Sequence, residues 1–99
     1  MIRHIVVWKL KSTDAAEREA NFLAMKSKLE ALVIADPGIK TIDVYKSMGL
    51  VEWHWDVVLV ADYETQAALD AYQVHPDHKA FVAWVADVSA ERIAIDYLV

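Results

Sequence analysis

The sequence contains no cysteine, and its 99 residues include only two glycines and two prolines. The absence of cysteine excludes a disulfide framework, and the scarcity of glycine and proline argues against a disordered or low-complexity chain. Lysine and arginine together number 10 against 15 acidic residues, which gives a formal net charge of −5. Nucleic-acid binding needs a basic surface for phosphate contacts, so we expect no nucleic-acid partner.

Long hydrophobic runs are also missing. No stretch of about 18 apolar residues occurs, so we expect no membrane-spanning helix and no membrane partner. The first residues lack the layout of a signal peptide, and we therefore expect a cytoplasmic protein. Even so, 57% of the residues are hydrophobic, more than one small core needs. The length indicates a single domain over residues 1–99.

Alternation of side chains with a period of two predicts four β-strands. These segments are Ile2–Leu10, Ile39–Met48, Trp53–Ala61 and Ile93–Val99. Within the third segment, Val57–Val60 is apolar on both sides, which predicts that both faces of the sheet are covered.

Helical spacing predicts a long helix that starts after Asp14 and ends at Pro37-Gly38. Asp14 and Glu17 have the spacing of a capping box, in which each side chain satisfies a backbone N–H at the helix start. A shorter helix is expected to open at Asp62–Thr65. His75-Pro76 splits it from a further helix, because proline is well tolerated at the first helical position.

The resulting order is β-α-β-β-α-β with the second helix split, which is the α+β ferredoxin-like plan of an antiparallel sheet with its helices on one face. The other face of the sheet is predicted to be apolar too, and a bare apolar face marks an interface. We therefore expect a homodimer in which two open sheet faces pack together. Trp53 and Trp55 share one face of the predicted third strand, so we expect them in this interface, or else in a stacking platform for an aromatic ligand.

The block from Tyr72 to His78 carries the most specific local chemistry. His75 and His78 have a spacing that can place two histidines on one face, but no HExxH motif or cysteine accompanies them, so we predict no metal and no cofactor. His78 lies in the first turn of a predicted helix, where the dipole favours a neutral imidazole that can accept a proton. The Tyr72 hydroxyl can then polarise a carbonyl.

Two further observations bear on this block. His4 and Trp8 share a face of the first strand and can meet Tyr72 and His78 across the fold. The alternative from the residues alone is structural. In that alternative His75 caps the following helix, and the aromatic rings fill the core while their polar tips bond to the backbone.

Five segments together resemble one known family over essentially the whole chain. They are His4–Leu10, Pro37–Ile39, Asp56–Val60, Tyr72–His78 and Asp96-Tyr97. The family is the stress-responsive α/β-barrel (Dabb) family. The resemblance implies a ferredoxin-like protomer and a homodimer whose two sheets form an α+β barrel. Many members have no assigned activity. Some plant relatives are stable, stress-induced proteins, one is a polyketide cyclase, and a fern relative is a hydroxynitrile lyase.

The resemblance also implies roles for individual residues. In the cyclase relative, the tyrosine and the second histidine of the Tyr-x-x-His-Pro-x-His block perform acid/base work, and they match Tyr72 and His78. The strand-one histidine that lines the same pocket matches His4. A further pocket histidine of the cyclase falls at or near Asp56 and is not retained, so the resemblance does not extend to that part of the cyclase site.

The leading hypothesis is a homodimeric Dabb-family protein that binds a small hydrophobic or aromatic molecule between sheet and helices. The residues expected to line its pocket are His4, Trp8, His75 and Phe81. One alternative is an acid/base enzyme of the polyketide cyclase or lyase type, with His78 as base and Tyr72 as hydrogen-bond donor. A second alternative is a non-catalytic stress or structural protein.

Overall fold

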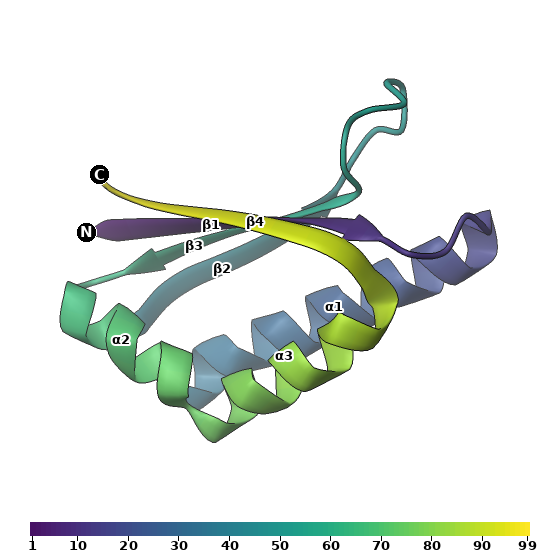
Figure 1. Ribbon diagram of the computed structural model, residues 1–99. Coiled ribbons are helices and arrows are strands. Elements are labelled where there is room, and N and C mark those ends of the chain that lie inside the picture. Colours follow the sequence, from purple (N-terminus) through teal and green to yellow (C-terminus); the bar gives the residue numbers. More distant parts are fainter.

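The computed structural model describes all 99 residues as a four-stranded antiparallel sheet with three helices on one face (Figure 1). The strands are β1 (Ile2–Leu10), β2 (Ile39–Lys46), β3 (Val57–Tyr63) and β4 (Ser89–Leu98), in the sheet order β2-β3-β1-β4. The helices are α1 (Ala15–Ala35), α2 (Gln66–Val74) and α3 (Pro76–Val88). This confirms the predicted ferredoxin-like order and the split second helix. None of the helices is both long and apolar enough to cross a bilayer.

The third strand begins four residues later than predicted, so the Trp53–Trp55 segment lies in a loop, residues 47–56, rather than in the sheet. Alternation over three residues is too short a signal, and here the backbone turns: the His54 N–H donates to the Val51 carbonyl over 3.1 Å. Trp53 is 79% exposed on this loop. The expectation that the two tryptophans share a strand face is therefore wrong.

Three other boundaries also move. β2 ends at Lys46, two residues before the predicted Met48. β3 continues through Tyr63, so Asp62 is not at a helix start but in the sheet, where its carboxylate accepts two hydrogen bonds from Arg3, at 2.8 and 3.0 Å. β4 starts at Ser89 instead of Ile93, because its first residues already pair with the end of β1 beside a bulge.

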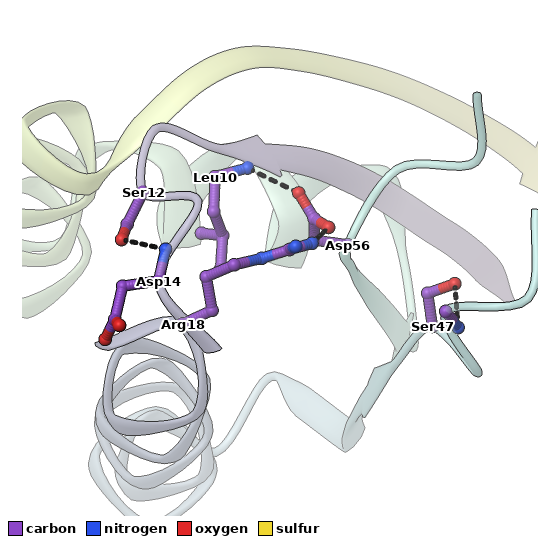
Figure 2. Close-up of polar contacts among 7 residues, drawn as sticks. Leu10, Ser12, Asp14, Arg18, Ser47 and Asp56 are labelled. Atoms are coloured by element: carbon purple, nitrogen blue, oxygen red, sulfur yellow. Dashed lines mark hydrogen bonds and ion pairs between the residues drawn. The ribbon is translucent and has the colours of Figure 1, made fainter. Parts of the chain in front are cut away.

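Side-chain caps explain where the helices begin. Asp14 accepts a hydrogen bond from the Glu17 N–H over 2.9 Å, which is half of the predicted capping box. The other half is absent, since the Asp14 N–H donates to the Ser12 hydroxyl instead (Figure 2). Thr65 caps α2 through the Ala68 N–H. His75 Nδ1 caps α3 by accepting from the Asp77 N–H over 3.1 Å, with Pro76 at the first position.

The hydrophobic core lies between the helices and the inner face of the sheet. Alternate residues of the strands point into it, and they meet Met25, Leu29 and Leu32 of α1 and Leu69 of α2. Its largest fully buried side chains include Tyr63, Tyr72 and Met25. His4 and Asp62 are the two buried polar residues.

The opposite face of the sheet carries no helix and is apolar. The β1 residues Ile5 and Val7 are half-buried on it, with Val60 and Val58 of β3 opposite them. On the other side they pair with Ile95 and Ile93 of β4, each 61% exposed. These six side chains, which we call the open face, form one continuous surface because neighbours across a sheet are adjacent.

Asp56 joins three parts of the chain at the end of the sheet (Figure 2). Its carboxylate accepts a hydrogen bond from the Leu10 N–H over 2.8 Å and forms an ion pair with Arg18 of α1. Its backbone N–H donates to the Trp8 carbonyl, and its carbonyl accepts from the Ser47 N–H. Asp56 therefore connects the end of β1, the start of α1 and the 47–56 loop through its side chain and backbone together.

Replacing Asp56 with alanine should lower the free energy of unfolding by about 1–3 kcal/mol, because the buried Leu10 N–H loses its partner. Denaturant unfolding measures this effect. Asp87→Ala on α3 removes a carboxylate that makes no hydrogen bond or ion pair, and it should change stability by no more than about 0.5 kcal/mol. Equal effects of the two substitutions would contradict the role given to Asp56.

Candidate functional site

A cavity of about 600 Å³ opens between the sheet and the last two helices. Its walls come from β1, β3 and β4 on the sheet side and from α2 and α3 on the helix side, and α1 contributes Leu29. The lining includes His4, Trp8, Tyr72, His78 and Phe81. Cavities of roughly 300–1,000 Å³ hold small organic ligands, so side chains leave room here for a molecule of that size.

The local sequence explains how these side chains meet. Period-two alternation in β1 directs His4 and Trp8 toward the helices. Tyr72 lies on the buried side of α2, with only 1% of its surface exposed. The break at His75-Pro76 redirects the chain, so that the ring of His78 packs against that of Tyr72 with centroids 4.2 Å apart.

His4 is fixed by a carboxylate. The pairing of β1 with β4 places His4 opposite Asp96, and its Nδ1 forms a hydrogen bond with the Asp96 side chain. A carboxylate only accepts, so this contact assigns the Nδ1 proton and leaves Nε2 as the free ring nitrogen. The ring of His4, which is 4% exposed, lies edge-on to Tyr63 at 6.2 Å.

Burial sets the protonation of the aromatic groups. Desolvation lowers the pKa of His78 below its ordinary 6.5, the hydrogen bond to the Gln73 carbonyl partly opposes this effect, and the positive charge of Arg92 lowers the pKa further. From the sequence, the helix dipole was expected to keep His78 neutral, whereas in the structure burial is the main cause of its lowered pKa. Burial also raises the pKa of Tyr72 to about 12, so its phenol keeps its proton.

This arrangement combines a neutral imidazole with a protonated phenol beside it. The imidazole can accept a proton, and the phenol can donate a hydrogen bond to a carbonyl oxygen. Close to them, His4 is held in one tautomer by Asp96. The site therefore has the groups that proton transfer next to a carbonyl needs.

The structure brings together five of the six residues singled out in the sequence. His4, Trp8, Tyr72, His78 and Phe81 all line the cavity, with the Trp8 and Phe81 rings 6.0 Å apart and nearly perpendicular. His75 is not part of the lining, because its ring caps α3. Asp56 also lies apart, at the end of the sheet that borders the 47–56 loop.

Sequence reasoning missed three charged residues of the cavity, Lys79, Glu91 and Arg92. Lys79 follows the histidine of the α3 first turn, and Arg92 lies in the part of β4 that was not predicted as strand. The alternation of Arg92, Ala94 and Asp96 indicates that the three share one face of the strand. Only the pairing with β1 shows that this face is the inner one. No three histidine, aspartate or glutamate side chains converge as metal ligands.

The family model for the stress-responsive A/B barrel domain (Dabb) matches residues 2–99. The chain belongs to the Dabb family. Among curated proteins, none matches this sequence.

Several solved structures have the same ferredoxin-like fold as this chain. A dimeric ferredoxin-like protein from Thermobifida fusca is 32% identical, with a TM-score of 0.81 over 99% of this chain and 90% of that one. A dimeric protein of the same fold from Bacteroides fragilis is 26% identical, with a TM-score of 0.89 over 99% and 95%. The hydroxynitrile lyase of Passiflora edulis, at 15% identity and a TM-score of 0.77 over 99% and 93%, shares the fold.

The lowered pKa of His78 makes stability depend on pH. Since the folded-state pKa lies below the unfolded value of about 6.5, the unfolded state binds a proton first as pH falls. Wild-type protein should therefore lose stability relative to His78→Gln on acidification below about 6.5. Denaturant unfolding of both proteins across this range measures the difference. Parallel stability curves would contradict a half-buried, neutral His78.

Proposed function

We propose that this Dabb protein acts in the cytoplasm as a homodimer and binds a small apolar or aromatic molecule in the cavity between β1, β4 and α3. The observation that carries the proposal is the cavity itself, which remains open beside a core of 18 buried hydrophobic residues. Aromatic and aliphatic side chains dominate small-molecule sites, with a few polar groups that fix orientation. Ten of the 17 lining residues are hydrophobic.

The aromatic wall supports a ring-shaped ligand. Trp8 and Phe81 meet edge to face and both line the cavity, so an aromatic ligand there can pack against them. The indole Nε1–H of Trp8 is buried and has no hydrogen-bond partner. Buried donors are nearly always paired, so a bound acceptor or water is the expected partner of this group.

The ligand proposal is tested by filling the cavity. Ala86→Phe places a ring in the lining, whereas Ala83→Phe places the same ring on an exposed part of α3 outside the cavity. A small phenol at ~100 times its dissociation constant should stabilise wild type and Ala83→Phe by about 2.7 kcal/mol in a thermal-shift assay. Ala86→Phe should show no shift. No response of wild type to any of a panel of phenols would support a non-catalytic structural protein instead.

The homodimer is supported by the open face and by the dimeric relatives. Ile93 and Ile95 would be buried if two sheets packed together, and such large exposed apolar surfaces are rare on monomers. The loop 47–56 rises on the same side of the sheet, away from the helices (Figure 1). Its exposed Met48, Leu50 and Trp53 extend the apolar surface toward a partner.

A charge on the open face should therefore dissociate the dimer. Ile95→Asp buries a carboxylate in the proposed interface, and the protein should elute with the mass of a monomer in size-exclusion chromatography with light scattering. Ile34→Asp is the matched control, since Ile34 is 91% exposed on α1, on the helix side of the sheet. A dimer that survives Ile95→Asp but not Ile34→Asp would place the interface on the helices.

An acid/base enzyme is the second candidate, and the contact between Tyr72 and His78 favours it. In this function His78 removes a proton next to a substrate carbonyl, Tyr72 hydrogen-bonds to the carbonyl oxygen, and His4 orients the substrate. His78→Ala should then cost roughly 10²–10⁴-fold in rate on a β-keto or phenolic substrate. Tyr72→Phe, which keeps the ring, separates the loss of the hydroxyl from the loss of packing. Full activity in His78→Ala would remove His78 from the mechanism.

A further inference from the structure

The edge strand β4 has an unusual polarity. Its residues opposite Trp8, Val6 and His4 of β1 face the helix layer, and they are Arg92, Ala94 and Asp96. The residues between them, Ile93 and Ile95, face the open side. In a sheet covered on one face, the covered side is normally the apolar one. Here the strand turns its polar side toward the cavity.

The charges on this inner side are not equivalent. Asp96 has a partner, because it bonds to His4. Arg92 forms neither a hydrogen bond nor an ion pair, although its side chain lines the cavity. Lys79 of α3 lines the same cavity and is also unpaired. The cavity wall therefore carries two cations without a counter-ion from the protein.

One carboxylate lies near these cations without neutralising them. Glu91 contributes to the lining, but it pairs in register with Lys9, whose side chain belongs to the open side of the sheet. No carboxylate lies within 4.0 Å of either Arg92 or Lys79. An anion in the cavity would have a guanidinium and an ammonium group available in its lining, and neither is paired with a carboxylate.

Arg92 is also within electrostatic reach of the aromatic pair. Burial is the main influence on the pKa values of Tyr72 and His78, raising the first and lowering the second, and the positive charge of Arg92 lowers both. Tyr72, His78 and Arg92 also line the same cavity, so a ligand that touches either ring can direct a charged end toward Arg92.

We propose that the ligand of this cavity carries a carboxylate, bound by Arg92 and Lys79, while its apolar body packs against Trp8 and Phe81. This inference rests on the proposed ligand-binding function and adds the chemical class of the ligand, a small aromatic or aliphatic acid. The planar guanidinium of arginine can hold both carboxylate oxygens at once, and lysine adds a second charge. Such charge-assisted bonds are stronger than neutral ones.

The test compares acids with their uncharged amides. Three acids are titrated calorimetrically into the 99-residue protein, each beside its primary amide: phenylacetate, 3-phenylpropanoate and 4-phenylbutanoate. We expect at least one acid to bind wild type about tenfold or more tightly than its amide, which is the lower end for a hydrogen bond to a charged group. The preference should weaken with added salt, because exposed charges are screened.

Variants assign the preference to the two cations. Arg92→Gln should abolish the advantage of the acid while leaving the affinity for the amide within about twofold, and Lys79→Gln should reduce it. Arg92→Lys keeps the positive charge but not the planar guanidinium, so it should retain part of the preference for the acid. Lys40→Gln is the control, since it removes the same charge from an exposed pair with Glu64 outside the cavity.

Three results would overturn the inference, and they differ in what else they contradict. If wild type binds acid and amide equally and Arg92→Gln changes neither affinity, the cavity is still a ligand site, but it does not recognise a carboxylate. Failure of every acid and amide to bind would contradict the proposed function as well. A preference for the acid that persists unchanged in both Arg92→Gln and Lys79→Gln would leave a carboxylate in the ligand but remove these two residues as its partners.

Discussion

The alternation of side chains along β1 is the constraint on which the rest of the structure depends. β1 lies between β3 and β4, so its even-numbered residues line the core and cavity while Ile5 and Val7 lie on the open face. A shift of one residue in register would exchange these two sets completely. The same strand thus fixes His4 and Trp8 in the site and supplies the centre of the surface that we assign to the dimer.

The cavity exists because the helix layer is incomplete over the edge of the sheet. The break at His75-Pro76 splits the second helical segment, and β4 remains exposed from Ala90 onward. A polar strand side is tolerated there, since Asp96 satisfies His4 and the cations remain in contact with solvent. The helix break therefore serves both fold and function, because it leaves room for the cavity and places the His78 ring beside Tyr72.

Most of the fold could be predicted from the periodicity of the side chains and from the residues that cap the helices. β1 and the start of α1 follow from an alternation over nine residues and from Asp14, and the split helix follows from Pro76. The tryptophan segment could not be placed, because two indoles two residues apart resemble a strand whether or not the backbone turns. The polar residues of the site could not be predicted from the sequence either, because only the pairing of β4 with β1 shows that Arg92 and Asp96 lie on the inner face. Asp56 stands near where the cyclase has a pocket histidine, yet it is tied to Leu10 and Arg18 instead.

The most direct test of the account is the indole N–H region of the ¹⁵N NMR spectrum during titration with 3-phenylpropanoate, the four signals being assigned by single Trp→Phe variants. Trp8 lines the cavity and its Nε1–H has no partner, while Trp53 is exposed on the distant loop. We expect a saturable shift of the Trp8 signal, with the Trp53 signal unchanged. A Trp8 signal that stays fixed while the ligand perturbs Trp53, or that no ligand of this class moves, would contradict a binding site between β1, β4 and α3.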